Sequence, residues 1–141
     1  MTYKVMVVDD AAMMRLYISS FLKTLPDFTM IAQANNGQEA LDKLEENPDV
    51  DLILLDIEMP VMDGIECLRR LKILSPAKVI VLSSLTHPAS PKAVEARLVG
   101  ADAVIGKPSG SVSKDVDASG GGLLIDTITR LLAPAPAGAA P

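Results

Sequence analysis

The chain has 141 residues, with 49% hydrophobic and 22% charged residues and a formal net charge of −5. This length suits one domain with a single core, and the acidic balance argues against a nucleic-acid-binding surface. A single cysteine excludes an intrachain disulfide, and no apolar run has the roughly 18 residues that a membrane helix needs. The N-terminus also lacks the apolar core of a signal peptide, so we expect a cytoplasmic protein without membrane insertion.

Short apolar runs of strand length alternate along the chain with segments of helical periodicity. The expected strands are residues 4–8, 29–34, 51–56, 78–82 and 103–105. The expected helices are marked by Met14, Ile18, Phe21 and Leu25 before Pro26, by Ala40, Leu41 and Leu44, by Ile65, Leu68 and Leu71, by Val94 and Leu98, both inward, within 88–98, and by Leu124, Ile128 and Leu131. A helix between consecutive strands gives parallel pairing with helices on both faces. The pattern predicts a doubly wound α/β fold.

The stretch from Asp51 to Gly64 organises the rest of the chain. Its apolar run reads as a strand buried on both faces, and the run stops at Asp56. Ligands of open α/β sheets bind at the carboxyl ends of the strands, so Asp56 is a candidate functional residue. Pro60 turns the chain out of the strand, and Asp63–Gly64 supplies a turn and a helix start. Cys67, early in that helix, is expected to be a small buried hydrophobe rather than a reactive thiol.

The composition changes after Pro108. Residues 109–122 are rich in Ser, Gly and Asp, which predicts a mobile loop, whereas 133–141 contain only Ala, Pro and Gly, as interdomain linkers do. We therefore expect one domain over residues 1–132, with this loop inside it. The linker at 133–141 would lead to a C-terminal effector domain that this chain does not include.

Polar side chains follow four of the expected strands at the same edge of the sheet. They are Asp9 and Asp10, Asp56, Ser83 and Lys107. Carboxylates brought together repel one another, so a cation is expected among them, and oxygen ligands favour Mg²⁺. Lys107 suits a phosphate oxygen, and Ser83 offers a neutral hydroxyl donor. The set describes a phosphoryl-transfer site with Asp56 as the candidate nucleophile.

Each of these residues also has a plainer interpretation. A lone acid at a strand end is usually solvated or caps a helix, a lysine before proline is usually a surface residue, and Ser83–Ser84 could be turn residues alone. The functional interpretation is favoured because the plain one needs a separate coincidence at each strand end. The lone histidine, His87, is read as a solvated loop residue.

In this order and at these strand ends, the residues resemble a response-regulator receiver domain. The resemblance is carried by Asp9–Asp10, Asp56, Met59–Pro60, Met62–Asp63–Gly64, Ser83 and Lys107–Pro108. It implies a flavodoxin-like five-stranded parallel sheet in the order 2-1-3-4-5, with Asp56 as phosphoacceptor. It also implies Mg²⁺ bound by the carboxylates of Asp10 and Asp56 and the backbone carbonyl of Glu58, with Asp9 acting through water. Lys107 would pair with the phosphoryl group, and Val104 stands where receivers usually carry an aromatic residue.

A narrower resemblance is to the N-terminal receiver of chemotaxis protein-glutamate methylesterases. It is carried by Ala12–Met13–Met14–Arg15 after the first acids, by Ser83–Ser84–Leu85–Thr86 and by Lys107–Pro108–Ser109–Gly110. It implies a chemotaxis-type histidine kinase as phosphodonor and a C-terminal methylesterase domain in cis as effector. No esterase nucleophile segment is present, so this chain itself would only gain and lose a phosphoryl group.

Other functions stay open at this point. The chain could be a stand-alone receiver, or a docking receiver that never takes phosphate. A Mg²⁺-dependent phosphohydrolase of the haloacid-dehalogenase type is disfavoured, because it needs a second acid two residues after a first-strand Asp, where this chain has Ala11 and Ala12.

Overall fold

The computed structural model describes residues 2–57, 62–83, 91–106 and 122–132. The chain divides into two compact units, residues 1–107 and 108–141. The first unit contains β1 (Tyr3–Val8), α1 (Ala12–Leu22), β2 (Phe28–Ala34), α2 (Gly37–Glu46), β3 (Leu52–Asp56), α3 (Gly64–Leu74), β4 (Lys78–Ser83), α4 (Pro91–Val99) and β5 (Ala103–Gly106). In the second unit the structure describes α5 (Gly122–Leu132).

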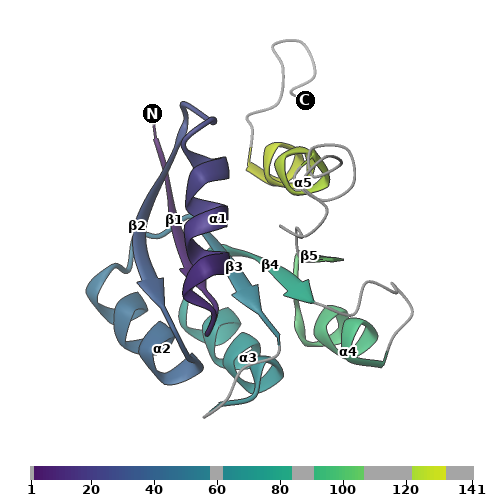
Figure 1. Cartoon of the computed structure of the whole chain (residues 1–141). Helices are drawn as coiled ribbons and strands as arrows, with labels where there is room; N and C mark the ends of the chain where they lie inside the picture. Colours follow the sequence, from purple (N-terminus) through teal and green to yellow (C-terminus); the bar gives the residue numbers. More distant parts are fainter. Residues whose placement is uncertain (1, 58–61, 84–90, 107–121, 133–141) are drawn as a thin grey trace, which may run out of the picture. The chain divides into compact units, whose positions relative to one another are not determined.

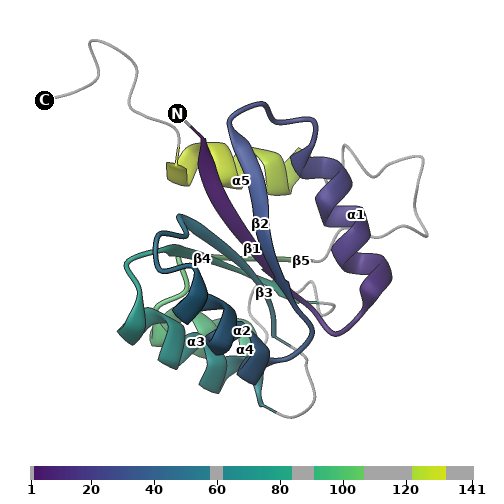
Figure 2. The same ribbon diagram turned by 90° about the vertical axis from the view of Figure 1, so that its left-hand side faces the viewer.

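The strands form one parallel sheet in the order β2-β1-β3-β4-β5, which confirms the predicted topology. Within the first unit, α1 lies on one side of the sheet and α2, α3 and α4 lie together on the other, as Figures 1 and 2 show. The three central strands are apolar and buried along most of their length, as expected for a parallel sheet covered on both faces.

Alternate residues of the central strands point to opposite faces of the sheet. On the face covered by α2, α3 and α4, one cluster joins Met6, Ile53 and Val79 to helix residues such as Leu44 and Leu68. Cys67 is fully buried in this cluster, as predicted, and burial raises the pKa of its thiol from 9.0 to about 12. Val104 of β5 packs against the same cluster.

The structure corrects the predicted inward face of the fourth helix. Val94 is 43% exposed and Leu98 is 83% exposed, whereas Ala93 and Ala96 are buried. Small side chains three positions apart let α4 approach its neighbours closely, and that contact decides which face turns inward. The predicted start of this helix at Pro88 lies outside the described residues.

The first helix is shorter than its apolar spacing predicts. α1 ends at Leu22, so Leu25 is not part of its buried face. Hydrogen bonds from Thr24 N to Phe21 O (3.0 Å) and from Leu25 N to Leu22 O (3.0 Å) have the i→i+3 spacing of a tighter turn. Such a turn takes the chain off the 3.6-residue period before Pro26 is reached.

Candidate functional site

Three carboxylates converge at the carboxyl edge of the sheet. Ligand oxygens from Asp9, Asp10 and Asp56 all lie within 4.8 Å of one another. Asp9 and Asp56 are fully buried, whereas Asp10 is exposed. The strand ends predict this meeting, although 46 positions separate Asp10 from Asp56 in the sequence.

Strand register explains the meeting. In the ladder between β1 and β3, Val8 pairs with Leu55, and the next residues along these strands are Asp9 and Asp56. The two strands run in the same direction and end level with each other (Figure 1). A shift of one residue would turn the side chains of one strand to the opposite face and separate the acids.

Asp9 is held in place by its own backbone and side chain. Its N–H donates to the carbonyl oxygen of Ala34 at 3.0 Å, and its Oδ1 accepts from the N–H of Ala11 at 2.8 Å. The second bond closes a local turn between β1 and α1, of a kind that aspartate side chains commonly form. α1 begins after Ala11, which provides no side-chain cap hydrogen bond.

Ser83 ends β4 beside the acids. Asp56 pairs with Leu82 in the ladder between β3 and β4, and Ser83 follows Leu82 with only 3% of its surface exposed. Ser83 pairs in turn with Gly106 of β5, the residue before Lys107. The placement of Ser83 next to the acid edge is therefore the one that the sequence predicts. Lys107 and Glu58 lie outside the described residues, so their predicted roles stay predictions.

The backbone of Ile57, directly after Asp56, is in close contact with both β4 and the start of α3. Ile57 N–H donates to the carbonyl oxygen of Leu82 at 3.1 Å, and a Cβ at Gly64 would lie 2.4 Å from the carbonyl oxygen of Ile57. Only glycine allows this approach, because real Cβ atoms do not come so near a carbonyl. Gly64 thus fixes the start of α3 against the end of β3.

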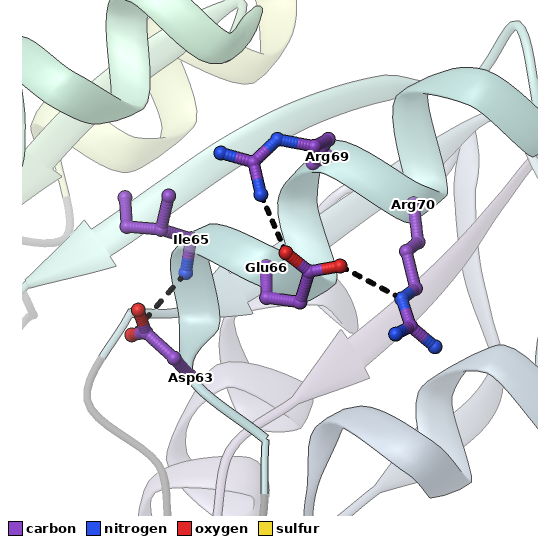
Figure 3. Close-up of polar contacts among 5 residues, drawn as sticks. All are labelled: Asp63, Ile65, Glu66, Arg69 and Arg70. Carbon is purple, nitrogen blue, oxygen red and sulfur yellow. Dashed lines mark hydrogen bonds and ion pairs between the residues drawn. The ribbon is translucent and has the colours of Figure 1, made fainter.

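The first turn of α3 is organised by acids, as Figure 3 shows. The carboxylate of Asp63 accepts from the N–H of Ile65 at 3.4 Å, which confirms the predicted helix start. Glu66 accepts from Arg70 Nε at 2.9 Å and also pairs with Arg69. Asp63 additionally lies 3.3 Å from Lys92 Nζ on α4, which links the α3 start to the next helix.

The donor set fits a hard divalent cation. Carboxylate oxygens are the ligands that Mg²⁺ and Ca²⁺ prefer. Mg²⁺ holds its ligands at about 2.0–2.1 Å, so two of them lie at most about 4.2 Å apart. The 4.8 Å limit for these carboxylates therefore needs only a small side-chain rotation, or one water molecule in place of a direct ligand. Like charges this close also favour a cation among them.

One residue near the acids carried no prediction. Arg15 on α1 donates from Nη1 to the backbone carbonyl oxygen of Asp9 at 2.6 Å and from Nε to Gln33 Oε1 at 3.2 Å. The only sequence signal for it was its place in the phrase after the acid pair. A bond to a backbone carbonyl leaves no pattern of residue types, so composition and spacing could not have predicted it.

Comparison with known proteins agrees with this geometry. Residues 5–113 match the family model described as the response regulator receiver domain. Among curated proteins, the chain is 44% identical over 116 residues to the protein-glutamate methylesterase/protein-glutamine glutaminase of Geobacillus kaustophilus, covering 82% of this chain and 33% of that protein. The match to one of the Vibrio cholerae proteins of the same name is 41% over 110 residues. The chain thus spans about a third of the length of these relatives.

Two solved structures are also similar. The response regulator domain of Thermotoga maritima CheB is 34% identical, with a TM-score of 0.83, and the match covers 96% of this chain and all of that one. A chain from the complex of the P1 domain of CheA3 with CheY6 from R. sphaeroides is 60% identical, with a TM-score of 0.79, and the match covers 94% and 98% of the two chains. In the described parts, no helix is long and apolar enough to cross a membrane. The chain therefore belongs to the response regulator receiver domain family.

Proposed function

We propose that this receiver accepts a phosphoryl group on Asp56 from the phosphohistidine of a chemotaxis-type histidine kinase and thereby switches an output surface. The observation that carries the proposal is the meeting of Asp9, Asp10 and Asp56 within 4.8 Å at the carboxyl edge of the sheet. A donor of this kind is supported by two similar solved chains, which come from complexes of CheY6 with the P1 domain of CheA3. In one of these complexes the P1 domain is phosphorylated.

The same acids are the proposed Mg²⁺ ligands. Asp10 and Asp56 would hold the ion through their carboxylates, Glu58 through its backbone carbonyl and Asp9 through a water molecule. When bound, Mg²⁺ offsets the negative charge on the transferring phosphoryl oxygens. The roles of Glu58 and Lys107 rest on the resemblance to other receivers and on the sequence.

The proposed transfer uses a carboxylate oxygen of Asp56 as the nucleophile. That oxygen attacks the phosphorus in line and forms an O–P bond, while the P–N bond to the kinase histidine breaks and its electron pair returns to the imidazole. Lys107 pairs with the phosphoryl oxygens. The Ser83 hydroxyl donates a hydrogen bond to one of them, and this new contact biases a two-state equilibrium of the output surface.

Labelling with a small phosphodonor tests the proposal. In Mg²⁺, radiolabelled acetyl phosphate should label each chain once and the label should decay slowly, whereas Asp56→Asn and wild type in EDTA should take up none. Asp42→Asn is the matched control, because Asp42 is an exposed acid on α2. Full labelling of Asp56→Asn would show that the nucleophile is another residue. Continuous release of phosphate from a phosphate ester would instead identify a phosphohydrolase, and no labelling at all would leave a docking receiver.

The role of Ser83 needs a separate measurement. Ser83→Ala should be labelled like wild type, but it should show smaller amide chemical-shift changes when beryllofluoride and Mg²⁺ are added. The variant loses the hydroxyl donor and keeps the acids. A response equal to that of wild type would remove Ser83 from the switch.

The comparisons favour two outputs. The curated relatives support regulation of a methylesterase domain in cis, since this chain covers about a third of their length. A receiver that acts on a separate partner is the second candidate, because the 60% identical chain comes from a complex of CheY6 with the P1 domain of CheA3 and not from a protein named as a methylesterase. The open reading frame past Pro141 distinguishes them: a continuing esterase sequence supports the first, and a stop codon the second.

A further inference from the structure

Arg15 contacts the peptide group that joins the two neighbouring acids. Its Nη1 donates to the carbonyl oxygen of Asp9 at 2.6 Å, and that oxygen belongs to the peptide unit between Asp9 and Asp10. A peptide unit is planar, so a bond to its oxygen restricts the orientation of the whole unit. The direction in which the Asp10 side chain leaves the backbone is restricted with it.

The guanidinium is itself held from a second side. Arg15 Nε donates to Gln33 Oε1 of β2 at 3.2 Å, so one planar group ties α1, β2 and the turn after β1 together. Both bonds leave from a rigid fork, a geometry that a lysine ammonium cannot reproduce. Arg15 is half-buried, and its bond to Asp9 lies in the partly buried region next to the site.

These contacts join a set of hydrogen bonds to the backbone and one carboxylate oxygen of Asp9. The N–H of Asp9 donates to the carbonyl oxygen of Ala34, and its own carbonyl oxygen accepts from Arg15. Its Oδ1 accepts from the N–H of Ala11. The helix dipole disfavours a positive charge in the first turn of a helix, so Arg15 at this place does not by itself stabilise α1. The contact with Asp9 is the compensating interaction at this place.

We infer that Arg15 is a positioning residue that orients Asp10 as a metal ligand. The inference rests on the proposed function for the identity of the ion. Arg15 acts through the peptide between Asp9 and Asp10 and touches neither the ion nor the phosphoryl group. Loss of hydrogen-bonded partners that orient metal ligands typically weakens metal binding by about 10–100-fold.

The charge of Arg15 has the opposite effect on Mg²⁺ affinity, so the two effects can be distinguished by experiment. Arg15 is also a positive charge bonded to the backbone of one acid of the cluster, and its removal by itself would strengthen the binding of a cation. Arg15→Met removes both the charge and the hydrogen bonds, whereas Arg15→Gln removes the charge and keeps a donor. Lys23→Met is the matched control, because Lys23 lies at the other end of α1, about 12 Å along the helix axis at 1.5 Å per residue.

The test is a Mg²⁺ titration of the full chain, in which binding is monitored through amide chemical shifts. Arg15→Met should raise the Mg²⁺ dissociation constant by about tenfold or more, Arg15→Gln should raise it less, and Lys23→Met should leave it unchanged. In the metal-free protein, Arg15→Met should also speed hydrogen exchange of the Ala11 amide, which bonds Asp9 Oδ1. An unchanged or lowered dissociation constant in Arg15→Met would overturn the inference.

Two further results separate the possible failures. If Arg15→Met does not fold, Gln33→Leu keeps the charge but frees one side of the guanidinium, and an unchanged dissociation constant in this variant would then overturn the inference. A wild-type chain that binds Mg²⁺ but takes no label on Asp56 overturns the proposed function, while a weakened Arg15→Met would still support positioning. A wild-type chain that does not bind Mg²⁺ overturns both.

Discussion

Gly64 stands where a single methyl group would meet main chain. A Cβ there would lie 2.4 Å from the carbonyl oxygen and 2.5 Å from the Cα of Ile57, the residue after the proposed phosphoacceptor. At Gly37, which begins α2, the nearest atoms belong instead to the side chain of Met62, at 2.8–3.1 Å. At Gly37 only the Cβ of Met62, at 2.8 Å, would have to shift with its backbone, whereas at Gly64 three main-chain atoms of Ile57 within 2.7 Å would have to move, so the two glycines should differ in tolerance.

We predict that Gly64→Ala lowers the free energy of unfolding by roughly 1–3 kcal/mol, the usual cost of overpacking, and slows the labelling of Asp56. Gly37→Ala should cost less and leave labelling unchanged. Urea denaturation and acetyl phosphate labelling of both variants give the comparison. Equal losses of stability would contradict the role of the Ile57 backbone contact.

The thiol of Cys67 should be inert while the protein is folded. Burial holds its pKa at about 12, so almost no thiolate exists near neutral pH, and the side chain is inaccessible. At pH 8, a thiol reagent should modify native protein only at the rate of unfolding, and denatured protein at once. Rapid modification of native protein would show that α3 opens locally. The burial of Cys67 also agrees with the prediction from its place beside Leu68.

At the scale of elements, α3 carries its acids in the first turn and at the cap. The pKa of Glu66 lies below its ordinary value of 4.5, chiefly because Arg70 donates a hydrogen bond to it, with the charges of Arg69 and Arg70 adding to this effect. A lowered folded-state pKa stabilises the fold above the unfolded value. That contribution is lost as the pH falls below 4.5 and through the folded value.

The stability of Glu66→Gln should therefore depend on pH in a defined way. Its deficit relative to wild type should be present at pH 7 and should shrink as the pH falls below 4.5, as measured by urea denaturation. In an Arg70→Met background the deficit at pH 7 should be smaller, because the main partner is gone. A deficit that does not shrink on acidification would indicate lost packing rather than lost charge.

Elements also show how far the sequence could be read. The alternation of strands and helices and the apolar runs predicted the parallel sheet, because burial on both faces leaves a direct mark on composition. The inward face of α4 was predicted wrongly, since Val94 and Leu98 are exposed while Ala93 and Ala96 are buried. At α4, close packing of small residues determines which face is buried more than side-chain hydrophobicity does. The end of α1 was missed because a tightened last turn depends on backbone hydrogen bonds.

The candidate site was predictable to the extent that strand ends define it. Asp9, Asp10 and Asp56 meet as expected, and Ser83 ends the neighbouring strand. The contact of Arg15 with the Asp9 carbonyl was not predictable, because any residue in that place has the same backbone oxygen. The positions of Lys107 and Glu58 lie outside the described residues and stay predictions.

For the whole molecule, the acid cluster should link Mg²⁺ to stability. A ligand that binds only the folded state adds RT ln(1 + [L]/Kd), or about 2.7 kcal/mol at a concentration of 100 Kd. Asp10→Asn should stabilise the metal-free protein, since one repelling carboxylate is removed, and should gain much less from Mg²⁺. Thermal unfolding in EDTA and in Mg²⁺ measures both effects.

Asp27→Asn is the control for total charge. Asp27 is exposed between α1 and β2, and its loss changes the formal net charge from −5 to −4, as the loss of Asp10 does. It should gain as much from Mg²⁺ as wild type. Equal behaviour of the two variants would mean that overall charge, and not the cluster, controls the response to the ion.

The level ends of β1 and β3 have a consequence for synthesis. Asp9 and Asp10 leave the ribosome well before Asp56, and the acids meet only after strands distant in sequence have paired. A nascent chain halted ahead of β3 would thus carry two carboxylates without the third, and would be unable to take up phosphate from any donor. Competence to receive a signal would arise only after β3 has been synthesised and has paired with β1.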